Sequence, residues 1–346
     1  MRLFLGTPDG LALFEDGEVT PLANTGVLCI VRLADGTVLA GTAAGSILSW
    51  SGVGETRVLA KDLGDAVTSL ALAKNGRLVA GCRPAGIWRS KDLGESWAVV
   101  STLAASPGAD MWTGDGDGIQ AAVSAVGNHH KDAKTIYVGI DAGGVYRSRD
   151  SGKSWYNLGL PCPEVQSIQL SAARPERVFV TTGAGLGGEK TAGLGGEKTA
   201  GLGAGKAGGS AGGRGAGCGA FCSDDEGISW RPIGESNRRQ YTMGLAAHPT
   251  EPDRVILSAS AGSPAGWKSH AHCDVYLSTD SGRRFRTVVK DLKGGVRRRA
   301  LVINPRVPSE AAFGTSTGEL WYSNDGGESF DPVGEGLPDL LAVAFA

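Results

Sequence analysis

Two aspartates are the first candidates for acid–base chemistry in this sequence. Asp117 lies in a stretch rich in Gly and Asp at 106–118, and Asp141 begins the segment Asp-Ala-Gly-Gly-Val-Tyr-Arg at 141–147. Hydrolysis of a glycosidic bond uses two carboxyl groups about 5 to 9 Å apart, one as the acid and the other as base or nucleophile. Gly-Asp turns at strand ends contain the same residue types, so the pair has both a catalytic and a structural interpretation.

Residues suited to binding surround these aspartates. Trp112 and Asp115 share the 106–118 stretch, where an aromatic ring beside carboxylates is typical of a carbohydrate site. A guanidinium group binds a carboxylate through two parallel hydrogen bonds, so converging arginines would bind an anion, whereas dispersed arginines would only favour solubility. Arginines occur in suitable loops at Arg83, Arg238, Arg239 and Arg297, the last in a run of three.

One later loop has the most varied chemistry of the chain. It contains Trp267, His270 and His272, and a metal ion could be held there with help from Cys218 or Cys222. The spacing of these residues matches no zinc pattern. We therefore predict no metal site and no cofactor.

A repeat determines where all these residues lie. The octet Ser-x-Asp-x-Gly-x-(Ser/Arg)-(Trp/Phe) occurs at 90–97, 148–155, 223–230, 278–285 and 323–330. Its aspartate can accept backbone N–H bonds within a turn, and its glycine can take a positive φ. The terminal aromatic ring can pack on a neighbouring sheet. We interpret the octet aspartates as structural and not as catalytic acids or calcium ligands: Asp92, Asp150, Asp225, Asp280 and Asp325.

Each octet lies on the turn between the third and fourth strands of a four-stranded unit. A strand, a short loop and a second strand precede the octet, as in 77–90 and 135–148, and an alternating apolar strand lies upstream. Four strands per repeat are typical of a β-propeller blade. Inner strands are expected at 27, 67, 119, 165, 241 and 296.

The ends of the chain supply one more blade. The first 22 residues contain three strands, and the missing inner strand is the apolar segment 340–345. Pairing of the two ends would leave no open sheet edge. The sequence therefore predicts an all-β fold, a seven-bladed β-propeller with four-stranded blades and blade 1 closed by residues 340–345.

The octets resemble the Asp-box, or BNR, repeats of sialidases, sortilin-like receptors, xyloglucan-degrading glycosidases and photosystem-assembly propellers. The resemblance covers nearly the whole chain and implies a fold more strongly than a function, because one fold hosts many functions. It implies that the octets lie on the face opposite the ligand. The ligand face would then comprise the loops between second and third strands and the crossovers between blades.

The resemblance also suggests an enzymatic interpretation of individual residues. Xyloglucanase-like families carry a catalytic aspartate in an Asp-x-Gly-Gly-x-Tyr stretch like that at Asp141, although in a different blade. Sialidases bind a carboxylate with three arginines from different blades. This chain lacks the Arg-Ile-Pro sequence of their first blade, and Tyr241 is a weak candidate for their nucleophile.

Composition excludes some partners. The formal net charge of the 346 residues is −2, and no run of about 20 apolar residues occurs, so we expect no nucleic-acid or membrane partner. No two of the six cysteines have CxxC spacing. The apolar run at the start of the chain is too short for the core of a signal peptide. We expect reduced thiols and a cytoplasmic protein.

The chain is expected to be a single domain, residues 1–346, with one insert. Residues 183–217 contain GLGGEKTA twice in tandem, cannot bury a core and are expected to form a flexible loop. The sequence GxxxxGK[ST] of a phosphate-binding loop is absent.

Two functions remain open from the sequence. The first is a non-catalytic propeller that binds a carbohydrate or protein at the channel mouth. The alternative is a glycoside hydrolase of sialidase or xyloglucanase type that uses carboxylates at the mouth.

Overall fold

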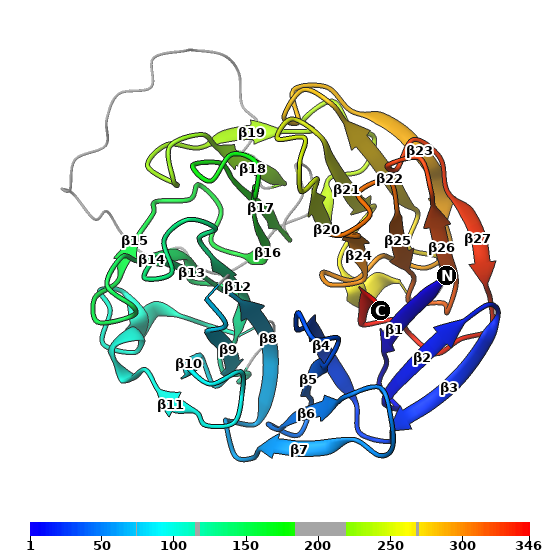
Figure 1. Cartoon of the computed structure of the whole chain (residues 1–346). Coiled ribbons are helices and arrows are strands. Elements are labelled where there is room, and N and C mark those ends of the chain that lie inside the picture. Colours follow the sequence, from blue (N-terminus) through cyan, green and yellow to red (C-terminus); the bar gives the residue numbers. More distant parts are fainter. Residues whose placement is uncertain (74, 115–117, 184–218, 268–269) are drawn as a thin grey trace, which may run out of the picture.

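Seven β-sheets of four antiparallel strands each form a ring (Figure 1). This computed structural model describes residues 1–73, 75–114, 118–183, 219–267 and 270–346. The helical segments among these residues are three short 3-10 turns, η1 (Ser101–Leu103), η2 (Ala109–Met111) and η3 (Pro264–Gly266). The predicted seven-bladed β-propeller is confirmed. Two predictions, Asp115 and Asp117 as site residues and the flexible insert beyond Gly183, lie outside the described residues.

Six blades follow one another along the chain, and each runs from its inner strand to its outer strand. Blades 2 to 4 comprise β4 (Val27–Arg32), β5 (Val38–Thr42), β6 (Ile47–Trp50) and β7 (Arg57–Ala60); β8 (Ala66–Leu72), β9 (Leu78–Arg83), β10 (Gly86–Ser90) and β11 (Ala98–Val99); and β12 (Val123–Asn128), β13 (Ile136–Ile140), β14 (Gly144–Ser148) and β15 (Tyr156–Asn157). Blades 5 to 7 comprise β16 (Val165–Leu170), β17 (Val178–Thr182), β18 (Ala220–Ser223) and β19 (Arg231–Ile233); β20 (Tyr241–Ala247), β21 (Val255–Ser260), β22 (Cys273–Ser278) and β23 (Arg286–Leu292); and β24 (Leu301–Ile303), β25 (Ala311–Gly314), β26 (Leu320–Ser323) and β27 (Asp331–Gly334).

Blade 1 joins the two ends of the chain. It contains β1 (Arg2–Gly6), β2 (Leu11–Glu15), β3 (Glu18–Ala23) and, as its inner strand, β28 (Ala342–Phe345). β28 pairs antiparallel with β1, with Leu3 opposite Phe345 and Gly6 opposite Ala342. The predicted closure is confirmed, and the strand begins at 342 instead of 340.

Two other inner strands begin later than the sequence predicts. β12 begins at Val123 instead of 119, because the carbonyl of Ile119 accepts a hydrogen bond from the Gly114 N–H within the preceding loop. β24 begins at Leu301 instead of 296, because the Ala300 N–H donates to the carbonyl of Arg297 and closes a turn there.

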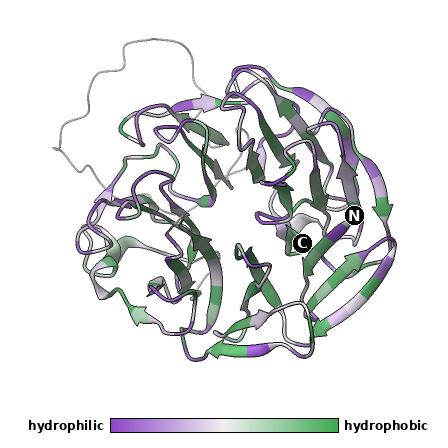
Figure 2. Cartoon of the chain, viewed as in Figure 1, coloured by the Kyte–Doolittle hydropathy of each residue, from purple (hydrophilic) through white to green (hydrophobic). Residues whose placement is uncertain are grey.

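Glycines in second strands let neighbouring blades pack closely. The strands are largely apolar (Figure 2), and their side chains fill the space between blades. A Cβ on Gly81 would lie 2.4 Å from Val123 of the next blade, and a Cβ on Gly139 would lie 2.4 Å from Val165. Only a residue without a Cβ allows this approach.

The octets form turns stabilised by side chains. In the second octet, Asp150 accepts hydrogen bonds from the hydroxyls of Ser148 and Ser154, at 2.8 and 2.6 Å, and from the Ser154 N–H at 2.9 Å. The Ser148 hydroxyl also accepts the N–H of Gly152, whose φ is +84°. The bonds from Ser154 hold the pKa of Asp150 well below its usual range. The bonds from the first serine and from the seventh backbone N–H recur at Asp92, Asp225, Asp280 and Asp325.

In blades 3 to 7, the octets all lie at the same end of the blade. In an antiparallel four-stranded sheet, the turn between the third and fourth strands lies at the same end as the loop between the first and second. Hydrogen bonds show this neighbourhood: Ser151 donates to the carbonyl of Lys134, and Ser281 donates to that of Asp253. The opposite end therefore carries the loops between second and third strands and the crossovers between blades.

The cysteines differ from expectation at one position. Cys29, Cys82, Cys222 and Cys273 are free and buried, but Cys162 is disulfide-bonded. The prediction of reduced thiols is therefore wrong at Cys162, since sequence spacing says nothing about which cysteines approach in space. No helix in the described part of the chain is long and apolar enough to span a membrane.

Candidate functional site

The loops opposite the octets form a continuous face, which we call the mouth. It comprises the loops between second and third strands and the crossovers that enter each new blade. Backbone bonds join the two kinds of segment: Asp65 donates to the carbonyl of Arg83, Gly143 to that of Pro163, and Ser316 to that of Gly295. These bonds hold the backbone of the mouth in place.

Asp141 is at the centre of an ionic cluster at the mouth. Its side chain is buried, and its Oδ2 lies 3.4 Å from the Arg83 guanidinium and accepts the Ala122 N–H at 3.3 Å. Its Oδ1 accepts a bond from Arg298 at 3.3 Å. Arg298 comes from the crossover into blade 7, so the cluster links it with the loops of blades 3 and 4. We call Arg83, Asp141 and Arg298 the Asp141 cluster.

Arg299 points to the interior of the ring next to this cluster. Its guanidinium donates to the carbonyl of Ser124 in β12. Burial lowers the pKa of Arg299 to about 10, and the nearby positive charge of Arg298 acts in the same direction. Arg299 therefore stays charged at neutral pH at a site where charge is costly.

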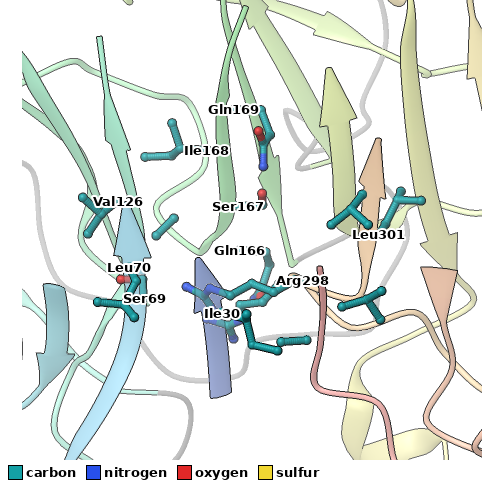
Figure 3. A pocket seen from close by; sticks show the side chains of 15 residues that line it. Ile30, Ser69, Leu70, Val126, Gln166, Ser167, Ile168, Gln169, Arg298 and Leu301 are labelled. Atoms are coloured by element: carbon teal, nitrogen blue, oxygen red, sulfur yellow. The ribbon is translucent and has the colours of Figure 1, made fainter. Parts of the chain in front are cut away.

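A cavity of about 160 Å³ lies at the centre of the ring (Figure 3). Inner strands of five blades and β28 line it with apolar groups such as Ile30, Leu70 and Leu301. Its polar lining includes Arg298, Arg299 and Gln166. No carboxylate of the described residues lines it.

The other predicted arginines have separate carboxylate partners. Arg238 binds the fully buried Asp274 through two nitrogens, at 3.1 and 2.8 Å. Arg239 lies 3.4 Å from Asp291. Arg297 binds Asp339 through two nitrogens, at 3.2 and 2.6 Å. Thus Arg83, Arg238 and Arg297 each bind a different aspartate, and the sequence did not identify those partners because they come from other segments.

The two tryptophans of the mouth pack against neighbouring groups. Trp112 is half-buried, donates to the Tyr146 hydroxyl at 3.1 Å and meets the tyrosine ring edge-on. Trp267 is buried at 6% exposure, and the Arg297 guanidinium lies 5.0 Å from its ring centroid. The face of Trp267 that a sugar would need is therefore covered by Arg297.

His270, His272 and Asp291 place their donor atoms within 4.8 Å of one another. The two imidazole rings are stacked, with centroids 3.9 Å apart and planes 9° from parallel. Ring nitrogens bind a metal in the plane of the ring, and one ion cannot lie in two parallel planes. The guanidinium of Arg239 also lies 3.4 Å from Asp291. This arrangement suits the 2.9 Å bond between His272 and Asp291 better than a cation.

Tyr241 has an acidic partner that sequence reasoning did not find. Its hydroxyl lies 3.1 Å from Oε1 of Glu164, and the same oxygen accepts a bond from Gln166 at 3.0 Å. Glu164 directly precedes β16, and Tyr241 begins β20, so the pair lies at the mouth between blades 5 and 6. A carboxylate beside a hydroxyl can activate it as a nucleophile.

Comparison with known proteins gives the fold. No protein-family model and no curated protein matches the sequence. Among solved structures, a GH74 enzyme from Niastella koreensis matches at a TM-score of 0.64 and 15% identity, over 93% of this chain and 50% of the enzyme. The GH74 xyloglucanase from Xanthomonas campestris matches at 0.60 and 16%, over 96% and 47%.

A third structure, YCF48 bound to D1 peptide, matches at a TM-score of 0.55 and 13% identity, over 89% of this chain and 82% of YCF48. At these sequence identities, the matches establish the propeller fold of this chain but give no information about its activity. The chain spans about half the length of the two GH74 enzymes.

Proposed function

We propose that the chain is a non-catalytic propeller that binds a carbohydrate or a protein segment at the mouth. The observation that carries this proposal is the Asp141 cluster, in which both oxygens of the buried carboxylate already accept bonds. A catalytic acid or nucleophile needs an oxygen directed at the substrate. Asp141 is instead placed to hold three segments of the mouth in fixed positions.

Fixed segments at the mouth, such as those joined by the Asp141 cluster, favour binding because little ordering entropy is lost when a ligand docks. The paired arginines Arg238 and Arg297 fix two further segments in the same way. A binding role is also supported by the fold match to YCF48, whose structure contains a bound peptide.

The test is binding without turnover. The full chain is labelled and applied to glycan and peptide arrays, and hits are titrated by calorimetry. The same preparation is incubated with each glycan hit, with aryl glycosides and with xyloglucan, and product release is measured. A saturable ligand that stays intact supports the proposal. Turnover that Asp141→Asn abolishes would refute it, as would the lack of any ligand.

A glycoside hydrolase is the second candidate, and the bond between Tyr241 and Glu164 favours it. In this proposal the tyrosine is the nucleophile, Glu164 is its base, and Asp117 or Asp141 supplies the acid. Hydrolysis of sialosides or aryl glycosides that is lost in Tyr241→Phe, with unchanged unfolding temperature, would support it. Equal turnover by the wild type and Tyr241→Phe would exclude this role for Tyr241.

A further inference from the structure

The cavity at the centre of the ring is lined by the guanidinium groups of Arg298 and Arg299 and lies beside the rest of the Asp141 cluster. Three guanidinium groups, from Arg83, Arg298 and Arg299, gather around one carboxylate, Asp141. Arg83 and Arg298 share Asp141, whereas the described bond of the Arg299 guanidinium is to a neutral carbonyl. Arg299 is thus the guanidinium of this group whose described bond is not to a carboxylate.

The nearest thiol does not supply the missing charge. Cys29 interacts electrostatically with Arg299, but burial raises the pKa of Cys29 to about 11. Cys29 is therefore neutral at physiological pH. Arg299 is partly exposed, and a partly desolvated cation is stabilised by an anionic counter-charge.

Polar atoms near the cavity also lack partners. The Nε of Arg83, the Oγ of Ser124 and the Oε1 of Gln166 are buried without a hydrogen-bond partner among the described residues. Arg83 Nε and Ser124 Oγ carry hydrogens to donate, whereas the Gln166 NH₂ group already donates to Glu164 at 3.0 Å. Buried groups of this kind usually bind an ion or water.

The volume of the cavity suits a small ligand. A cavity of about 150 Å³ holds one benzene molecule, and this one measures about 160 Å³. A small oxyanion therefore fits in this cavity. Its other walls are serine hydroxyls and apolar side chains, such as Ser69, Ser167 and Ile30, which do not repel an anion.

The geometry points to a binding site for a small oxyanion in the central cavity, held by Arg298 and Arg299. The ligand class is a phosphate, a sulfate or a small carboxylate, which share charge and acceptor oxygens. This site shares Arg298 with the Asp141 cluster of the mouth, and it stands whether or not the chain is an enzyme. The anion would neutralise Arg299 and join the inner strands around it.

The test uses the full chain in phosphate-free buffer at constant ionic strength set with chloride. Inorganic phosphate, sulfate and acetate are titrated by calorimetry, and the unfolding temperature is recorded at each concentration. We expect saturable binding of at least one anion and a rising unfolding temperature. The relative affinities of the three anions identify the class of the natural ligand.

Arg299→Met removes the charge and keeps a similar length. It is expected to weaken binding at least tenfold and to abolish the rise in unfolding temperature, while Arg57→Met, an exposed arginine of blade 2, changes neither. Arg298→Met is the second variant and should also weaken binding if Arg299→Met does not fold. No saturable binding of any of the three anions to the wild type would overturn the proposal. Equal affinity in all folded variants would also overturn it.

Discussion

The replacement of Gly81 by alanine tests whether close packing between blades limits the sequence. A Cβ at Gly81 would lie 2.4 Å from both the Ser69 hydroxyl and a methyl group of Val123. Normal contacts between such atoms are about 3.5 to 4.0 Å, so blades 3 and 4 would have to separate by roughly 1 Å. Overpacking of this kind costs about 1–3 kcal/mol.

A second effect of the same substitution acts in the opposite direction. Alanine has less freedom than glycine in the unfolded chain, which stabilises the folded state by about 0.4–1 kcal/mol where no strain results. Gly262→Ala is the matched control, since a methyl group added there would meet nothing within 4 Å and its φ is outside the left-handed region. Because the unfolded-state effect is common to both variants, their difference isolates the clash.

The assay is urea unfolding followed by tryptophan fluorescence. Gly81→Ala should be less stable than Gly262→Ala by about 1–3 kcal/mol with the same denaturant slope. Equal midpoints for the two variants would refute the argument that a glycine is required for the approach of the next inner strand. A changed slope would instead mean that unfolding is no longer two-state.

Further predictions concern the closure, the octets and a buried arginine. Deletion of 342–346 exposes the edge of β1 and should convert cooperative unfolding into aggregation, seen by light scattering, whereas adding a polar tag after 346 should not. The pKa of Asp92 is lowered to about 2 by bonds from Ser96, so its stabilising effect is complete above the unfolded pKa of about 3.9 and is lost as pH falls towards 2. Asp92→Asn should therefore reduce the fall in the free energy of unfolding as the pH is lowered from about 4 towards 2. An unchanged pH dependence in this range would contradict the prediction. Arg177 is buried and joins aspartates of two blades, so Arg177→Met should lower the unfolding temperature more than Arg57→Met, which removes an exposed pair. Equal shifts in these two variants would show that the buried pairs contribute no more than the exposed one.

The sequence was sufficient to predict the fold because the same octet and the same pattern of strands recur along the chain. Five octets in register mark the ends of blades, and the apolar run at the end of the chain matches the one strand missing at its start. Strand starts at 119 and 296 were wrong because apolar residues there belong to turns, whose hydrogen bonds depend on neighbouring loops.

The candidate site was predicted less completely. Asp141 was identified at the mouth, but its bonds to Arg298 bridge residues that are 157 positions apart in the chain. The sequence alone could not predict that the three consecutive arginines at 297–299 have different surroundings. Arg297 binds Asp339, Arg298 binds Asp141, and Arg299 lines the cavity. Repeats specify strands, whereas loop residues acquire their partners only from the assembled ring.

The pairing of β28 with β1 has a consequence for biosynthesis. A ribosome releases the chain from its first residue onward, so β1 to β3 emerge early but lack their inner strand until Phe345 has been made. The inner edge of β1 therefore stays without its pairing strand throughout the synthesis of the other six blades. Blades 2 to 7 can form their sheets as they emerge, because each is contiguous in sequence. The ring thus becomes complete only after Phe345 has been made, and a stop codon before residue 342 leaves a chain whose first sheet has no inner strand.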